Sequence, residues 1–235
     1  MNTYAAVAEK LGQVGKLLVA EAKVEPGMEV LDVATGTGNV AVGAGKEGAR
    51  VTAIDPNPEL IEIARERAAD NMLEVEWLEG GVDPLPFEDA SFDRVLSAFG
   101  SLYAPRPERA ASELVRVCRP GGAVGICNWT PAGVGGRMYA ILDSEPMLWG
   151  DEEQLRELFG ERCADLRTEL RSVSFSERSP QAWLEFVSQS LAPFEGEPSE
   201  EQKAELLELF TDANTSADGG LQFEQEYLLA VARLA

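Results

Sequence analysis

The stretch that most constrains the fold is residues 30–41, which read VLDVATGTGNVA. An apolar run comes first, a turn with Gly36 and Gly38 follows, and the last residues can begin a helix. The apolar run suits a strand that is buried on both faces, as in a parallel sheet. The glycines allow a sharp turn and leave room for a ligand to approach the main chain. We therefore expect a strand, a ligand-binding turn and a helix in that order.

Two features of this turn indicate the charge of the ligand. The helix that follows would point unpaired N–H groups at it, which favours an anionic group. Asp32, at the end of the strand, favours a cationic group nearby. The corner therefore suits a ligand that carries both charges, such as an amino acid head.

A second strand-like run, residues 50–55, also ends in an acid, Asp55. An acidic residue about 20 positions after a glycine-rich turn is where a βαβ unit binds ribose hydroxyls. The alternative is that Asp55 only caps the helix that begins near Pro58. The spacing favours a nucleoside ligand.

These motifs resemble a known family. The D-x-A-T-G-T-G pattern from Asp32 to Gly38, with Asp55, resembles motif I and the second-strand acid of class I S-adenosylmethionine (SAM) dependent methyltransferases. The segments LPF at 85–87 and ELVRVCRPGG at 113–122 extend the resemblance over roughly residues 28–129. A nicotinamide-dependent oxidoreductase, the other enzyme class with such a turn, fits the pattern less well.

The resemblance implies an α/β, Rossmann-like, doubly wound and mostly parallel seven-stranded sheet, with an N-terminal helix and an inserted helical cap. Residues 1–235 would form a single domain, with a core at about 26–130 and the cap and last strands at about 131–235. The N-terminal segment either packs on the sheet edge or covers the cofactor.

The resemblance also implies SAM as the cofactor, with its methionine part at the glycine turn and its ribose at the second acid. Family members usually carry an Asp that meets the adenine amino group, and Gly81 stands in its place. Because of this departure, the alternative that the protein is a SAM-binding regulator without catalytic activity remains. The residues that we expect to bind SAM are Asp32, Ala34, Thr35, Gly36, Gly38, Asp55, Pro56, Gly81, Val82, Ala98 and Phe99.

Composition limits the partners. The formal net charge of −21, from 41 acidic and 20 basic side chains, would repel nucleic acids and anionic membranes. No stretch reads as a signal peptide or reaches transmembrane length, so we expect a cytoplasmic protein that acts on a small molecule. The three cysteines lack metal-ligand spacing and the chain has no histidine, so we expect no metal site. The sequence leaves the oligomeric state open.

The acceptor is constrained less sharply. A hydroxyl acceptor usually needs a base, commonly His or a carboxylate, so the lack of histidine favours a sulfur or an activated carbon. We expect Tyr4, Tyr103 and Asn128 to orient the acceptor. Several aromatic residues of the cap either fill a core or bind a bulky, largely apolar acceptor. They are Trp183, Phe186, Phe194 and Phe210.

Within this family, the sequence resembles two groups of methyltransferases. The sheet motifs resemble those of ubiquinone/menaquinone-type C-methyltransferases, which implies methylation of a quinone ring. They equally resemble small methyltransferases that tailor antibiotics, which share the core and vary the cap. The lack of histidine and the aromatic cap favour the tailoring group, with a sulfur-bearing peptide antibiotic as one example.

Overall fold

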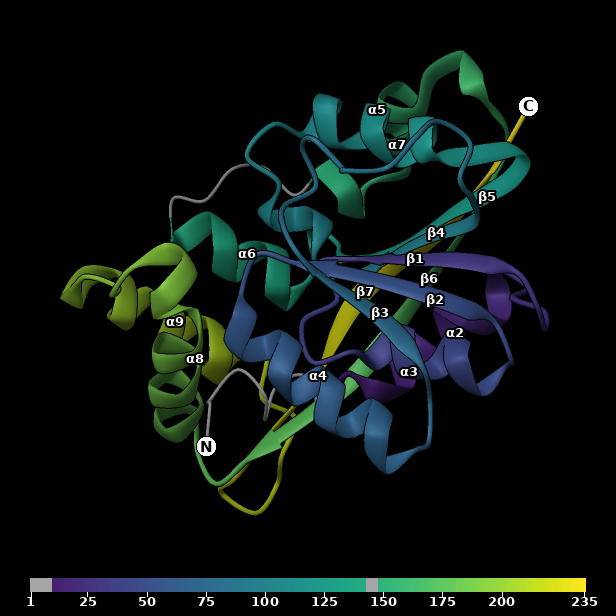
Figure 1. The fold of residues 1–235 in the computed structure, drawn as a ribbon. Helices are drawn as coiled ribbons and strands as arrows, with labels where there is room; N and C mark the ends of the chain where they lie inside the picture. The colour runs from purple at the N-terminus through teal and green to yellow at the C-terminus, as the bar shows by residue number, and fades with distance from the viewer. Residues whose placement is uncertain (1–9, 143–147) are drawn as a thin grey trace.

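The computed structural model describes residues 10–142 and 148–235. Within these ranges one seven-stranded sheet has the order β3-β2-β1-β4-β5-β7-β6 (Figure 1). The first five strands of this order run parallel, and β7 is antiparallel to both β5 and β6. The strands are β1 (Glu29–Val33), β2 (Arg50–Asp55), β3 (Val75–Glu79), β4 (Phe92–Ala98), β5 (Cys118–Trp129), β6 (Cys163–Glu177) and β7 (Leu221–Leu234).

Helices cover both faces of the sheet, which confirms the predicted doubly wound fold. On one face lie α2 (Gly12–Glu21), α3 (Asn39–Lys46) and α4 (Pro58–Asp70), as Figure 1 shows. On the other lie α5 (Pro107–Val117) and α7 (Glu152–Phe159). Because the central strands have helices on both sides, most of their buried side chains are apolar, and Val30, Leu31 and Leu96 are fully buried.

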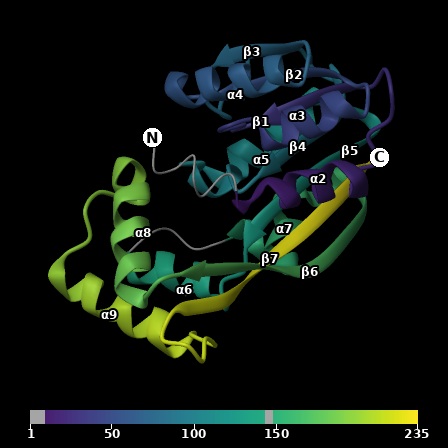
Figure 2. The same ribbon diagram turned by 90° about the horizontal axis from the view of Figure 1, so that it is seen from below.

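The cap follows the parallel strands in sequence and packs beside their carboxyl ends. It consists of α6 (Val134–Ile141), α8 (Pro180–Glu195) and α9 (Glu200–Asp212), which project as a lobe in Figure 2. A capping box starts α9, with Ser199 accepting from the Gln202 backbone and Gln202 accepting from the Ser199 backbone. Phe210 and Trp183 pack on Phe223 of β7, so one apolar core joins the cap to the sheet.

Short 3₁₀ turns complete the description. They are η1 (Ser101–Tyr103), η2 (Leu148–Gly150) and η3 (Gly160–Arg162).

No helix in the described ranges is long and apolar enough to cross a membrane. Cys118 and Cys127 are buried free thiols, and Cys163 is a half-buried one.

One boundary differs from expectation. The segment Arg119-Pro120-Gly121-Gly122 suggests a tight turn before a strand at 123–129, whereas β5 already begins at Cys118. The reason is that Cys118 pairs with Phe92 at the start of β4, and the ladder then shifts register before Ala123 pairs with Arg94. The turn is therefore an irregularity inside a longer strand.

The loops after β1 and β4 touch each other closely. A Cβ atom added at Gly100 would lie 2.3 Å from the Cβ of Ala34 and 2.9 Å from its carbonyl oxygen. Ala34 and Phe99 both have positive φ, 54° and 62°, which is unusual for residues other than glycine. The close approach thus depends on a glycine at position 100.

We expect Gly100→Ala to lower the free energy of unfolding by about 1–3 kcal/mol, because the added methyl group overpacks this junction. Gly81→Ala is the matched control, since a Cβ at Gly81 meets no atom within 4 Å and its φ is not positive. Urea unfolding followed by circular dichroism measures both. Equal stability of the two variants would contradict the close packing of these loops.

Candidate functional site

Asp32 fixes the glycine turn from inside. Its side chain is 1% exposed, and its Oδ2 accepts hydrogen bonds from the Thr35 hydroxyl at 2.5 Å and the Ala41 amide at 2.9 Å. One bond reaches the turn and the other reaches the first turn of α3, so the carboxylate ties the strand to both. Burial raises the pKa of Asp32 to about 7, against the lowering effect of these two donors.

Asp55 joins the second βα corner to the first. Its Oδ2 accepts a hydrogen bond from the Gly36 amide at 2.7 Å, and its Oδ1 accepts one from the Asn57 amide at 2.8 Å. The Thr35 amide also donates to the Ile54 carbonyl at 3.1 Å. Asp55 is 5% exposed, and burial raises its pKa above the ordinary value. The two predicted acids therefore hold one continuous corner.

Arg67 of α4 supports the turn from the outside. Its guanidinium donates to the Thr37 carbonyl and hydroxyl oxygens, at 2.5 and 3.0 Å, and to Asn39 Oδ1 at 3.0 Å. No pattern in the sequence indicates this role, because an arginine on a helix with other charged residues is expected to face the solvent. Arg67 fixes the carbonyl of Thr37 and so orients the amides on either side of it.

A cavity of about 30 Å³ opens above the turn. The turn backbone faces it, with Gly36 and Gly38 at φ of 54° and 81°, and α3 begins at Asn39 without a side-chain cap. The Gly36 and Gly38 amides already donate to Asp55 Oδ2 and to the Thr35 carbonyl, so an anionic group would have to meet other amides near the start of α3. The lining residues are Leu11, Asp32, Ala34, Thr35, Gly36, Thr37, Asn39, Val40, Ala98 and Phe99.

Six of the residues predicted to bind the cofactor line this cavity, and the others lie around it. Gly38 is buried at the start of α3, and Asp55 stands behind Gly36. The loop after β3 is held beside Asp55 by the Gly80 amide, which donates to the Asp55 carbonyl at 3.0 Å. Pro56, Gly81 and Val82 are exposed or half-buried near that rim and remain predictions. The prediction missed Leu11, Thr37, Asn39 and Val40, of which two stand inside the quoted TGTGN turn.

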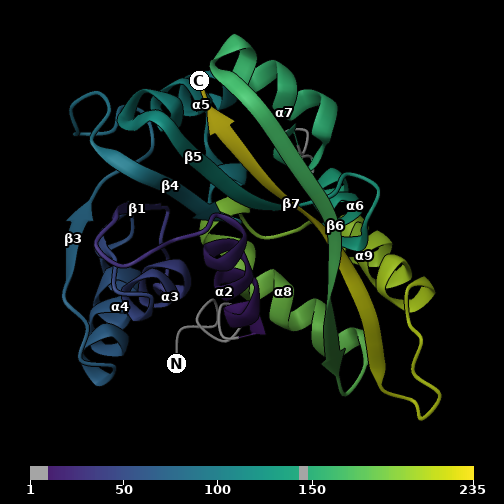
Figure 3. The ribbon, with the colours of Figure 1, turned by 90° about the vertical axis from the view of Figure 1, so that its right-hand side faces the viewer.

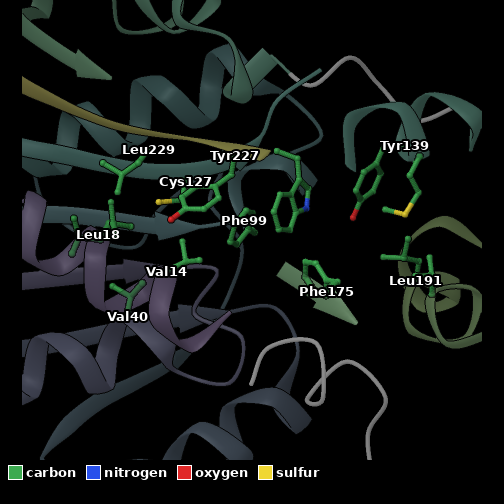
Figure 4. Packing of buried hydrophobic residues seen from close by; sticks show 14 of the residues in the cluster. Val14, Leu18, Val40, Phe99, Cys127, Tyr139, Phe175, Leu191, Tyr227 and Leu229 are labelled. Atoms are coloured by element: carbon green, nitrogen blue, oxygen red, sulfur yellow. The ribbon is translucent and has the colours of Figure 1, made fainter. Parts of the chain in front are cut away.

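A second cavity, of about 60 Å³, lies between the sheet and the cap. Its lining is mainly aromatic and aliphatic, and the described lining residues include no Asp, Glu, Lys or Arg. Tyr139 of α6 and Leu191 of α8 lie on the other side of this cavity from Phe175 (Figure 4). The lining residues are Leu11, Phe99, Leu102, Tyr103, Trp129, Met138, Tyr139, Phe175, Trp183, Val187, Ser190, Leu191 and Gln225.

Phe99 is the wall between the two cavities. It lines both, and Figure 4 shows it between Val14 on one side and Phe175 on the other. Its ring stacks on Trp129 with centroids 4.0 Å apart, and its amide donates to the Cys127 carbonyl at 2.7 Å. The positive φ of Phe99 directs the chain so that its ring reaches this position. A ligand in one cavity would therefore meet a ligand in the other at this ring.

The three residues expected to orient the acceptor have different positions. Tyr103 lines the second cavity, and its hydroxyl forms a 2.6 Å hydrogen bond with the hydroxyl of Tyr139, a residue that sequence reasoning missed. Asn128 is fully buried and donates to the Ser101 hydroxyl at 2.7 Å, and it lines neither cavity. Tyr4 lies outside the described residues. Of the two described residues, Tyr103 therefore lines the cavity and Asn128 does not.

A larger hollow of about 230 Å³ lies at the opposite ends of the strands, between the end of α2 and β6. Arg94, Ala123 and Arg233 line it, and no predicted cofactor residue does. Open α/β sheets bind their ligands at the carboxyl ends of the strands. This rule favours the two smaller cavities, which lie at those ends, as the functional site. No group of three or more potential metal ligands occurs in the described ranges.

Comparisons with known proteins identify the family and the fold. A family model described as a methyltransferase domain matches residues 30–122. An uncharacterised protein of Mycobacterium tuberculosis is 42% identical over 185 residues, which are 74% of this chain and 68% of that protein. A ubiquinone/menaquinone biosynthesis C-methyltransferase of Brucella anthropi is 44% identical over 105 residues, which are 41% of this chain and 39% of that enzyme. The crystal structure of the YcgJ protein of Bacillus subtilis has the same fold, with a TM-score of 0.69 at 16% identity over 97% of this chain and 98% of that one.

The raised pKa of Asp32 makes a prediction about stability in the absence of ligand. A buried acid that binds its proton more tightly in the folded state destabilises that state as pH rises from the unfolded pKa of 3.8 to the folded value of about 7. The loss is at most about 4 kcal/mol. We therefore expect Asp32→Asn, which cannot ionise, to gain stability relative to the wild type between pH 4 and pH 7, and no further gain above pH 8.

Urea unfolding of both proteins at several pH values measures this difference. Using the difference cancels the contribution of the other acidic groups, which the two proteins share. A difference that does not change with pH would mean that Asp32 titrates normally in the folded protein.

The contacts of Arg67 make a prediction about binding. Arg67→Ala removes the support of the Thr37 carbonyl, so we expect the Kd for SAM to rise about 10-fold, the effect of roughly 1.4 kcal/mol. Arg65→Ala, on the same helix, is the control, because Arg65 is half exposed and reaches only Glu62 at 3.7 Å. Isothermal calorimetry distinguishes the two, and equal affinities would show that Arg67 does not position the turn.

Proposed function

We propose that this protein, which belongs to the class I SAM-dependent methyltransferases, transfers the methyl group to a bulky, largely apolar small molecule at a sulfur or activated carbon atom. The observation that carries the proposal is the aromatic cavity that adjoins the cofactor cavity at Phe99. A lining of this kind favours an apolar ligand. A carboxylate that could act as a general base is missing from its described lining.

The residues present fit SAM. The start of α3 suits its carboxylate, and the ammonium group would favour the ionised form of the nearby Asp32. The corner formed by Asp55 and the loop at Gly81 lies where the ribose and adenine would extend. Each oxygen of Asp55 already accepts one amide, and a carboxylate oxygen can accept a second donor. SAM supplies an activated methyl group on a positively charged sulfur.

The chain's own contribution is to orient the acceptor and to exclude water. Holding two reactants in line can lower a barrier by roughly 7–11 kcal/mol without any acid or base. Phe99 and Trp129 form an apolar floor at the meeting point of the cavities, and the hydroxyls of Tyr103 and Tyr139 supply hydrogen bonds at its side. This lining suits a thioether, a disulfide or a similar nucleophile that needs no deprotonation.

We assign the reaction to natural-product biosynthesis, such as the tailoring of a sulfur-bearing peptide antibiotic, in the cytoplasm. Free cysteines support a reducing compartment. A second candidate is C-methylation of a quinone ring, and the similarity to the Brucella anthropi enzyme favours it. That similarity covers the cofactor half only, whereas the cavity lining comes mainly from the cap and the last strands. A SAM-binding regulator is the third candidate.

Incubation with methyl-labelled SAM and a panel of acceptors tests the proposal. The panel contains lipophilic thiols, thioethers and disulfides, quinols with an isoprenoid tail, phenols and aliphatic alcohols. We expect label on sulfur or on a ring carbon. Transfer to aliphatic alcohols alone would contradict the proposal, and SAM binding without transfer to any acceptor would favour the regulator.

Tyr103→Phe tests the acceptor cavity. Loss of one hydrogen bond to the acceptor should lower kcat/KM for that acceptor about 10-fold and leave the Kd for SAM unchanged. Tyr227→Phe is the control, because Tyr227 is 1% exposed in the same core and lines neither cavity. If Tyr103→Phe changes the affinity for SAM instead, the phenol belongs to the cofactor site.

A further inference from the structure

Strand β6 forms one outer edge of the sheet and pairs with β7 on its inner side only. No strand of the described ranges pairs with its outer side, and α7 packs beside its first half, where the Thr168 hydroxyl donates to Glu152 (Figure 3). The ladder with β7 is regular from Asp165 to Glu177. Residues 163–177 contain no proline and no lysine, two residues that proteins commonly use to prevent pairing at an exposed edge.

The side chains along this edge alternate in charge. Asp165, Arg167, Glu169 and Arg171 lie two residues apart and so share one face of the strand. Their exposed side-chain fractions are 55%, 73%, 53% and 27%. Leu170 points to the other face and is 61% exposed, one of the two large hydrophobic residues of the described ranges that are exposed. The edge therefore offers open backbone, an exposed apolar side chain and charges of both signs.

We propose that two copies of this chain pair through β6 in antiparallel orientation, with the twofold axis at Thr168. In this register Asp165 lies opposite Arg171 of the second copy, and Arg167 lies opposite Glu169. The symmetry repeats both pairs, so all four charged side chains gain an oppositely charged neighbour. Leu170 lies opposite Leu166, and its exposed surface is covered. Cross-strand pairs of this kind lie about 4.5–5.5 Å apart and stabilise a sheet.

The charge pattern selects this register over its neighbours. With the axis at Arg167 or at Glu169, residues of like charge face each other, which destabilises a strand pair. A parallel copy in register would also place like charges together. With the axis at Leu166, only Asp165 and Arg167 form pairs of opposite charge. With the axis at Leu170, only Glu169 and Arg171 do. Of the registers compared, only the one with the axis at Thr168 gives each of the four charged side chains an oppositely charged neighbour.

The ion pairs within the strand are compatible with this arrangement. Arg167 reaches Asp165 at 3.2 Å, and Arg171 reaches Glu169 at 2.7 Å and Glu21 of α2 at 3.3 Å. These side chains already lie along the face where the partner's charges would add. The net charge of −21 on each copy opposes association, but at about 0.15 M salt the Debye length of about 8 Å screens charges far from the edge. Short pairs at the edge remain effective.

Charge-reversed variants test the proposal with the full chain. Asp165→Lys with Glu169→Lys makes the edge cationic, and Arg167→Glu with Arg171→Glu makes it anionic. Sedimentation velocity in 0.15 M salt, from about 1 μM to about 300 μM, covers the Kd expected of a small interface. We expect the wild type to dimerise, each variant alone to remain monomeric, and an equimolar mixture of the two to form dimers again. A wild type that stays monomeric, or variants that dimerise as well as the wild type, would overturn the proposal.

A disulfide test reads the register directly and does not depend on charge. In a Cys163→Ser background, Thr168→Cys places a thiol on the twofold axis, where it meets its own copy. Ser172→Cys is the matched control, because it lies on the same face but opposite Ala164. We expect mild oxidation to give a covalent dimer with Thr168→Cys and only monomer with Ser172→Cys. Equal cross-linking at both positions would contradict this register.

Discussion

The hydrogen bond from the Gly36 amide to the Asp55 carboxylate is the contact on which the site depends. It joins the corner after β1 to the corner after β2, and the shared parallel register of these strands brings the two ends level. Asp32 then fixes the inner side of the same turn through Thr35 and Ala41. Burying two carboxylates is unfavourable, and both pKa values rise accordingly. The backbone amides that they accept offset part of this cost and hold the turn open for a ligand.

The parallel and antiparallel halves of the sheet contribute to different cavities. Its parallel half supplies the cofactor corner, because parallel strands direct their carboxyl ends to one edge. The antiparallel pair β6 and β7 supplies Phe175 and Gln225 to the second cavity, while α6 and α8 close it. Phe99 stands at the boundary, held by Trp129 and by an unusual backbone angle. In the proposed reaction, the methyl donor and the acceptor would meet at this ring from separate cavities.

The same antiparallel pair gives the molecule its longest open edge. On the inner side, β7 is shielded between β5 and β6, and its residues Leu228, Ala230 and Ala232 are buried. On the outer side, β6 alternates charge instead of presenting a single sign. In a chain that is strongly acidic overall, Arg167 and Arg171 are a local exception, and neither lines the cofactor cavity or the aromatic cavity.

The amino-acid sequence by itself determined the local elements and the cofactor corner. The bounds of α3, β2, α5 and β7 follow from apolar runs and from flanking glycine and proline, which act over a few residues. The spacing between Asp32 and Asp55 was sufficient to place both acids at one edge, because parallel strands joined by one helix leave little freedom.

Only the tertiary structure decided which side chains meet. Tyr103 and Tyr139 are 36 residues apart, and Arg67 is 30 residues from Thr37, so no local pattern connects them. Asn128 lies at the predicted strand end, but the alternation of side chains along β5 turns it to Ser101, while its neighbour Trp129 lines the cavity. A sequence fixes the order of elements through short-range preferences, whereas the direction of each side chain depends on the faces that packing finally buries.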